Sequence, residues 1–174
     1  LTFDEAVTAG ALTLTGNIVV DASAAATFGT VTAGAGSVVE MANMTITTQS
    51  GSGVYRYRTG YPSTVANQNL TYEYVGTDDP EHPGTVNLNG MRGVVRTTGY
   101  MSITGYYPVN TGAKLDVVSG TTSLSASAQG ICGYITIREG ATLKNLVTDS
   151  LAYSSYSSII DIYGTLDMGT SRWT

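Results

Sequence analysis

The chain has 174 residues, of which 42% are hydrophobic and only 12% are charged, about half the charged share of an average soluble domain. This length allows one domain with a substantial core, and the abundant threonine, serine and glycine favour strands and turns over helices. The net charge is −5 and no basic run occurs. We therefore expect no nucleic acid partner, because phosphate contacts need clustered lysine and arginine.

The chain contains a single cysteine, Cys132, which cannot form an internal disulfide and is interpreted as a small buried hydrophobe. The N-terminal residues lack the basic start and apolar run of a signal peptide, and no apolar run reaches membrane-spanning length. The sequence lacks an initiator methionine and stops just after a strand-like segment, as is typical of a fragment of a longer chain. We therefore expect an internal segment of a longer protein.

Short segments that alternate apolar and polar residues recur through residues 1–50. They cover residues 12–20, 28–41 and 44–47 and contain or border glycine turns. Alternation at a period of two is typical of half-buried strands. Residues 1–50 are therefore predicted to form the first coils of a stack of short strands.

Residues 51–84 interrupt this pattern. Two alternating segments, 54–58 and 70–75, are separated by eleven residues, and the polar loop 77–84 follows. We predict a lateral insertion here, in the form of an antiparallel hairpin with a long loop. On the first strand the tyrosines are expected on one face and the arginines on the other, so that aromatic pairs and Arg–Glu pairs form across the strands.

Tyrosine is concentrated in this insertion, which holds five of the 12 tyrosines in the chain. A tyrosine ring combines an apolar face with a hydroxyl, which suits carbohydrate stacking and protein interfaces. The alternative is that these rings pack across strands and contact no ligand. The candidate binding residues are Tyr55, Arg56, Tyr57, Arg58, Tyr61, Tyr72 and Tyr74.

Residues 85–174 return to the strand pattern, with strands predicted near 86–90, 101–105, 115–120, 135–143 and 160–168. Glycine begins several of the corners, at Gly112, Gly140 and Gly164, where a positive φ is expected. Strand onsets are about 15 to 25 residues apart, as in coils of two or three strands.

The predicted fold is therefore all-β, a right-handed parallel β-helix (β-solenoid) that forms one continuous domain. A β-sandwich with hairpin connections is the structural alternative, since it also uses short strands and glycine turns. In the solenoid the apolar residues of each strand should point inward, namely Leu12, Leu14, Ile18, Val31, Ile46, Leu88, Ile103, Leu115, Ile135, Ile137, Leu143, Ile160, Ile162 and Leu166.

The residues that could support catalysis or bind metal are sparse. The acidic cluster of Asp78, Asp79, Glu81 and His82 lacks calcium-loop spacing and is interpreted as a solvated loop. His82 is the only histidine, which excludes a multi-histidine zinc site, and no Gly-x-Ser-x-Gly elbow accompanies it. We predict no catalytic residue, no metal and no cofactor.

Polysaccharide lyases and hydrolases also use β-helices, so an enzyme is an alternative function. Glycoside hydrolysis needs two or three converging carboxylates. The acids carried by strands are scattered among different units and are expected to face solvent: Asp116, Asp161 and Asp167. The arginines that a lyase would use as a base have no acidic neighbourhood apart from Glu139: Arg92, Arg96 and Arg138.

Three units of the second half, residues 117–124, 137–143 and 162–168, resemble passenger segments of bacterial autotransporters and other β-helical adhesins. Phage tail fibres and tailspikes have a similar texture. The resemblance implies export to the cell surface and a role in adhesion, aggregation or shielding. It assigns no functional residue.

The expected function is that of a non-catalytic extracellular surface segment, an adhesin or structural fibre that presents a repetitive β surface. The expected partners are further coils of the same protein or another surface protein, together with glycans or a host-cell surface. The alternatives are a carbohydrate-active β-helix enzyme, lyase or hydrolase, and a phage tail fibre or tailspike segment.

Overall fold

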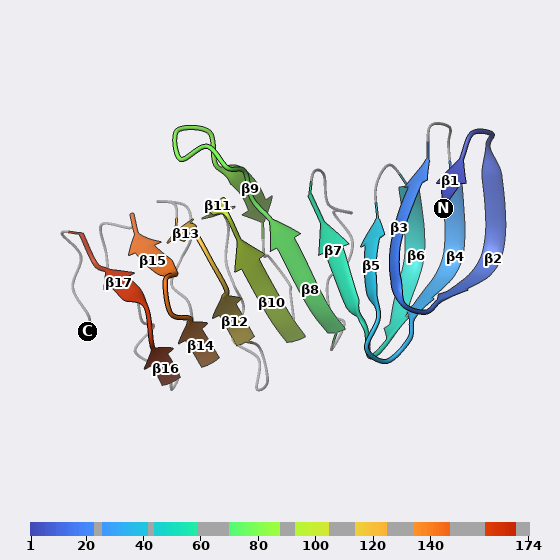
Figure 1. The fold of residues 1–174 in the computed structure, drawn as a ribbon. Helices are drawn as coiled ribbons and strands as arrows, with labels where there is room; N and C mark the ends of the chain where they lie inside the picture. The colour runs from blue at the N-terminus through green and yellow to red at the C-terminus, as the bar shows by residue number, and fades with distance from the viewer. Residues whose placement is uncertain are drawn as a thin grey trace.

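The computed structural model describes residues 1–22, 26–41, 44–58, 70–87, 93–104, 114–124, 134–146 and 159–169. These residues form seventeen strands and no helix, so none of them belongs to a helix suited to crossing a membrane. The strands lie in three sheets, and within each sheet the strands follow one another along the axis of the molecule (Figure 1).

One sheet of nine strands runs the length of the molecule. Its strands, in spatial order, are β1 (Thr2–Phe3), β3 (Asn17–Ala22), β5 (Val38–Met41), β7 (Val54–Tyr57), β8 (Leu70–Val75), β10 (Gly93–Thr98), β12 (Lys114–Val117), β14 (Tyr134–Ile137) and β16 (Ile159–Ile162).

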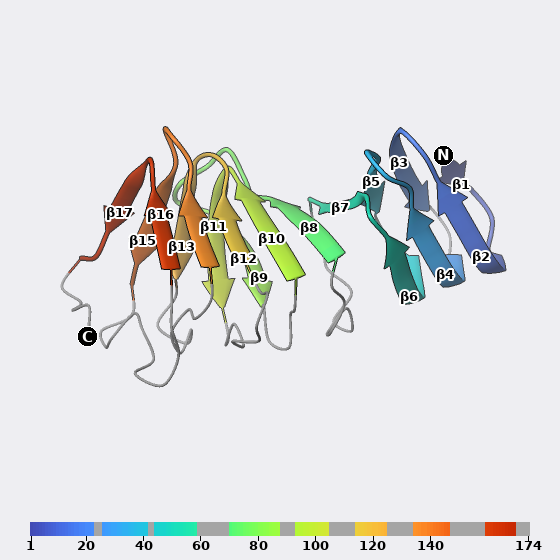
Figure 2. The same cartoon turned by 90° about the horizontal axis from the view of Figure 1, so that it is seen from below.

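Two smaller sheets accompany it in succession. The first comprises β2 (Val7–Leu14), β4 (Ala26–Ala33) and β6 (Met44–Gly51). The second comprises β9 (Gly84–Asn87), β11 (Tyr100–Thr104), β13 (Thr121–Leu124), β15 (Thr142–Asn145) and β17 (Thr165–Asp167). Figure 2 shows the first companion sheet at the N-terminal end and the second at the other end.

Every ladder between these strands is parallel, and each strand pairs with its equivalents in neighbouring coils. This confirms the β-solenoid and overturns the β-sandwich, which would need antiparallel ladders. The one antiparallel contact among the described residues is an isolated bridge between Thr77 and Tyr100. The right-handed sense of the coil stays a prediction.

Inward side chains stack in columns because equivalent residues of successive strands face one another. One column of the nine-stranded sheet is Ile18, Val39, Tyr55, Tyr72, Val95, Leu115, Ile135 and Ile160. Its middle six members are buried. Each such burial stabilises the fold by about 1.5–3 kcal/mol, so these columns provide much of the driving force for folding.

Most of the predicted inward residues are confirmed. Eight are buried, namely Leu14, Val31, Ile46, Ile103, Leu115, Ile135, Ile137 and Leu143, and four are partly buried against the core, namely Leu12, Ile18, Ile160 and Leu166. Leu88 lies outside the described residues. Ile162 continues an inward column, in register with buried Ile137, as predicted, but it is 49% exposed. It lies on β16, the last described strand of its sheet, and no described strand covers its column.

The predicted antiparallel hairpin at residues 51–84 was wrong. β7 and β8 pair in parallel within the nine-stranded sheet, with Tyr55 beside Tyr72 and Tyr57 beside Tyr74. The reason is burial, because this register continues the inward columns and covers all four rings. Residues 76–83 do project past the neighbouring strands as a loop (Figure 1).

The corner glycines have two different causes. Gly140 has φ 75°, as predicted for a tight corner. Gly164 is needed for close approach, since a Cβ there would lie 2.3 Å from the carbonyl oxygens of both Ala141 and Arg138. Gly112 lies outside the described residues.

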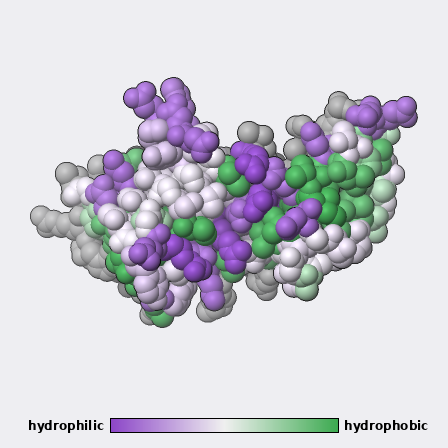
Figure 3. All heavy atoms as spheres, viewed as in Figure 1, coloured by the Kyte–Doolittle hydropathy of each residue, from purple (hydrophilic) through white to green (hydrophobic). Residues whose placement is uncertain are grey.

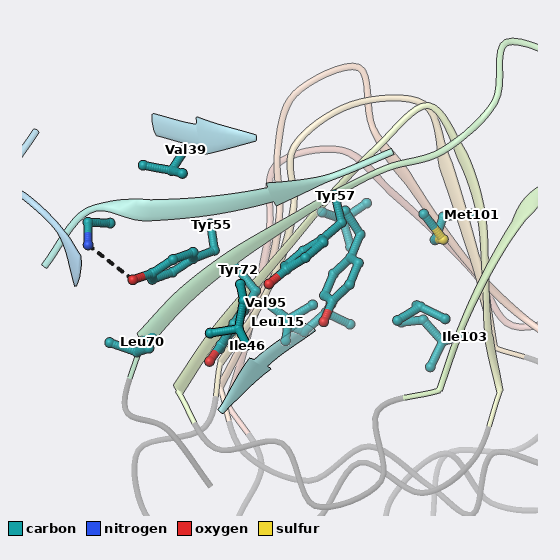
Figure 4. Close-up of a cluster of buried hydrophobic side chains, with 14 of the residues drawn as sticks. Val39, Ile46, Tyr55, Tyr57, Leu70, Tyr72, Val95, Met101, Ile103 and Leu115 are labelled. Atoms are coloured by element: carbon teal, nitrogen blue, oxygen red, sulfur yellow. Dashed lines mark hydrogen bonds between the residues drawn. The ribbon is translucent and has the colours of Figure 1, made fainter. Parts of the chain in front are cut away.

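Tyr55, Tyr57 and Tyr72 fill the core where the companion sheet changes (Figure 4), and buried Tyr74 packs against Tyr57. Neighbouring rings of Tyr55, Tyr57, Tyr72 and Tyr74 have centroids 5.7 to 6.5 Å apart. The Tyr55 hydroxyl accepts a hydrogen bond from the Ala33 backbone N–H (3.0 Å) and lies 2.7 Å from the carbonyl oxygens of Val31 and Ser50. Tyr55 therefore ties the nine-stranded sheet to the backbone of β4 and β6.

The tyrosine hydroxyls provide a matched test of this packing. Tyr55→Phe should lower the free energy of unfolding by about 1–3 kcal/mol, because it leaves buried backbone groups of β4 and β6 unsatisfied. Tyr72→Phe should be nearly neutral, because the Tyr72 hydroxyl is buried without a hydrogen-bond partner in the described part of the chain. Urea unfolding of both variants measures the difference, and equal losses would contradict the assigned role of Tyr55.

Candidate functional site

The outward face of the nine-stranded sheet carries side chains of alternating charge, one on each of five successive strands. In register, Glu40 faces Arg56, Arg56 faces Glu73, Glu73 faces Arg96 and Arg96 faces Asp116. We call these five residues the charge ladder. Adjacent strands lie about 4.8 Å apart, close enough for each charge to interact with both neighbours. Figure 3 shows hydrophilic side chains gathered over the middle of the molecule.

The position of the charge ladder follows from the same alternation that forms the core. Along β7, half-buried Val54 and Arg56 alternate with buried Tyr55 and Tyr57. β8 and β10 repeat the pattern with Glu73 and Arg96 outward. Because side chains of a strand alternate between its two faces, burying the apolar residues fixes the charged ones on the surface.

The predicted arginines both lie on this face and are engaged in ion pairs. Arg56 Nε donates to Glu73 Oε1 at 2.8 Å, and Arg58 Nε donates to Glu40 Oε1 at 2.7 Å. The hydrogen bond to Glu40 raises the pKa of Arg58 above its usual value. The predicted pairing of an arginine with Glu73 is thus confirmed for Arg56, although it forms between parallel strands, whereas Arg58 pairs with Glu40 of β5, which was not predicted.

The predicted tyrosines lie beneath this face and not on it. Tyr55, Tyr57, Tyr72 and Tyr74 are all buried, so they offer no ring face to a ligand. Burial raises the pKa of the Tyr55, Tyr57 and Tyr72 hydroxyls, which therefore stay neutral. The packing interpretation agrees with these positions. Tyr61 lies outside the described residues.

A groove crosses the middle of the charge ladder. It is lined by Glu73, Arg96, Asp116, Val118 and Arg138. Arg138 donates from Nε and Nη2 to the two oxygens of Asp116, at 2.8 and 2.9 Å, in a bidentate pair that raises the pKa of the arginine. Arg96 Nε lies 3.8 Å from Asp116 Oδ2, which is too long for a hydrogen bond.

The sequence analysis missed this groove. It placed Arg96 and Arg138 away from acids and Asp116 in solvent, whereas Asp116 is buried between the two arginines. The partners come from neighbouring coils, so they are about 20 residues apart in the chain. Charged residues at outward positions of strands one coil apart were the signal that would have found them. Arg92 lies outside the described residues.

The other acids that the sequence analysis singled out lie outside the groove. Asp161 accepts a hydrogen bond from the Tyr134 hydroxyl, and Asp167 accepts one from the Gly169 backbone N–H. In the loop after β8, His82 Nδ1 lies 2.8 Å from Asp79 Oδ2, and this contact is the main cause of the lowered pKa of Asp79. No three His, Cys, Asp or Glu side chains group to hold a metal in the described part of the chain.

A second exposed face differs sharply in chemistry. The strands β2, β4 and β6 contain no charged residue. Their outward rows are built of hydroxyl side chains, such as Thr8, Thr27 and Thr45, which stand in register. The Thr32 and Ser50 hydroxyls in another row are 2.7 Å apart. The charges are thus concentrated on the nine-stranded sheet.

Comparison of the chain with protein-family models, curated proteins and solved structures finds no match. The functional argument therefore depends on the residues and their geometry.

Thr136 offers a test of the charge ladder, because it stands in register between Asp116 and Asp161. Thr136→Lys should raise the free energy of unfolding by about 0.2–1 kcal/mol, since it extends the alternation of charge. Thr136→Glu should lower it by a similar amount at low salt, with the difference shrinking as salt is added. Thermal unfolding of the two variants at two ionic strengths measures this effect, and an identical response would contradict a coupled ladder.

Proposed function

We propose that the chain is a non-catalytic segment of an extracellular surface protein, an adhesin or structural fibre, that binds through the outward face of its nine-stranded sheet. The observation that carries the proposal is the charge ladder, which places five charged side chains at regular strand spacing and leaves its two arginines more exposed than its three acids. The partner classes proposed are glycans, a host-cell surface and other surface proteins. A regularly spaced surface suits a partner that is itself repetitive.

The state of the charged groups supports binding over catalysis. Both oxygens of Asp116 accept from Arg138, and Glu73 Oε1 accepts from Arg56. A general acid or base must exchange a proton with its substrate, whereas these three carboxylate oxygens already accept hydrogen bonds from arginine side chains. Fixed charges of this kind recognise a partner without changing it.

Apolar residues at the ends of the stack support further coils or another surface protein as a partner. Ile162 and Tyr163 are exposed at the last described strands, as is Leu1 at the first. Unpaired edges of a parallel sheet are templates for additional strands. We propose that such strands continue the sheet.

Adhesion to cells tests the proposed function directly. Beads coated with the protein should bind cultured cells, and the double variant Arg56→Ser, Arg96→Ser should bind at least about threefold less, because two donors of the ladder are lost. The control is Thr8→Glu, Thr45→Glu, which makes the same change in net charge on the uncharged face. Circular dichroism checks that both variants stay folded. Equal adhesion by both variants would contradict binding through this face.

The groove gives the enzyme alternative one specific observation. It places two carboxylates, Glu73 and Asp116, beside Arg96 and Arg138 on the outside of a β-solenoid. We expect no unsaturated or reducing ends when the protein is incubated with polygalacturonate or alginate, because Arg138, one of the two arginines of the groove, is paired with both oxygens of Asp116, which raises its pKa. Products that disappear in Asp116→Asn would overturn the non-catalytic proposal.

A further inference from the structure

We propose that the solenoid has a weak junction between β7 and β8, at which two parts of the chain open and unfold as separate cooperative units. The first part comprises β1 to β7 and the second comprises β8 to β17. This inference concerns how the fold opens, so it does not depend on the proposed function. Three observations support it: the number of ladders at the junction, the direction of the side-chain hydrogen bonds of β7, and buried polar atoms without partners.

The junction carries fewer backbone ladders than the boundaries on either side of it. The coil of β6 and β7 joins the preceding coil through two ladders, with seven and three residue pairs in register. The coil of β8 and β9 joins the following coil through two ladders, with six and four pairs. Among the described strands, only β7 and β8 pair across the junction, over four residues. β6 and β9 are edge strands of different companion sheets and lie apart (Figures 1 and 2).

The polar side chains of β7 hold this strand to the first part. The Tyr55 hydroxyl bonds to backbone groups of β4 and β6. The Tyr57 hydroxyl accepts a hydrogen bond from Gln49 Nε2 on β6, and Arg58 Nε donates to Glu40 Oε1 on β5. These bonds fix β7 to the strands that precede it, so the boundary between the two parts lies after β7.

Besides the single ladder, two kinds of side-chain contact cross the junction. Arg56 Nε donates to Glu73 Oε1 on β8 at 2.8 Å, but the arginine side chain is 31% exposed. An ion pair that is open to solvent contributes little to stability and is screened by salt. The tyrosine rings of β7 pack on those of β8, with centroids 5.7 to 6.5 Å apart. These contacts keep the junction closed in the native state, but they do not replace a second ladder of backbone hydrogen bonds.

Buried polar atoms without partners lie beside the junction. The Tyr72 hydroxyl on β8 and Gln49 Oε1 on β6 are buried and have no hydrogen-bond partner in the described part of the chain. A buried polar group without a partner is destabilising relative to the same group in water. Opening of the junction admits water to both atoms, so it satisfies groups that the closed form leaves unsatisfied.

Each part contains its own companion sheet and its own buried side chains. Phe28 and Val31 are buried in the first part, and Ile103 and Leu143 are buried in the second. The stability of a solenoid is approximately a sum of terms for each coil and for each interface between neighbouring coils. A stack therefore separates where that interface is weakest, and the units on either side open independently. Here the weakest interface is the junction, and its opening exposes the four tyrosine rings.

The test is native-state hydrogen exchange of the whole chain at increasing urea, measured by mass spectrometry in the Cys132→Ser background. Amide protons of the two parts should exchange at rates that differ at least about tenfold, with the step between β7 and β8. A disulfide formed by Val54→Cys and Thr71→Cys, which stand in register across the junction, should remove the step because it links the two units.

The matched control is a disulfide formed by Val94→Cys and Lys114→Cys, in register on β10 and β12. Two ladders already join these coils, so this disulfide should leave the step in place. Reduction of the disulfide between residues 54 and 71 should restore the step, which separates the effect of the bond from that of the substitutions. A common exchange rate in both parts, a step at another boundary, a step that persists with the junction disulfide, or an equal effect of the two disulfides would each overturn the inference.

Discussion

The in-register parallel pairing of the nine-stranded sheet is the constraint on which the rest of the structure depends. One alternation along each strand decides both faces at once, so a shift by one residue would exchange core and surface. Tyr55 beside Tyr72 and Arg56 beside Glu73 are two sides of the same register. The hydrophobic columns inside and the charge ladder outside therefore depend on the same register, and a change of register would disrupt both.

The nine-stranded sheet packs against two different companion sheets along its length. The nine-stranded sheet continues without a break while its companion changes from β2, β4 and β6 to the strands β9 to β17. Three large rings fill the core at that change, and the Tyr55 hydroxyl bonds to backbone groups that the change would otherwise leave unsatisfied. Tyrosine suits this place because it combines a large apolar ring with a polar end.

The same rigidity bears on recognition. Side chains held on paired strands keep their spacing before a partner arrives, so less conformational freedom is lost on binding. The bidentate pair of Arg138 with Asp116 fixes one side of the groove. Arg96, between Glu73 and Asp116, keeps donors available within this fixed frame. The groove thus combines ordered acceptors with an arginine that can still form strong hydrogen bonds.

The sequence by itself determined that the chain is an all-β solenoid, because glycine corners and alternation along short strands are local signals. The same alternation determined which side chains of the segment 54–58 point inward and which point outward. It did not determine which strand pairs with which. An antiparallel hairpin and a parallel stack satisfy the same alternation in β7 and β8, and only the burial of four rings between sheets selects the stack. The groove was likewise decided by the tertiary structure. Arg96, Asp116 and Arg138 are distant in the chain and meet because each coil returns the backbone to the neighbouring strand.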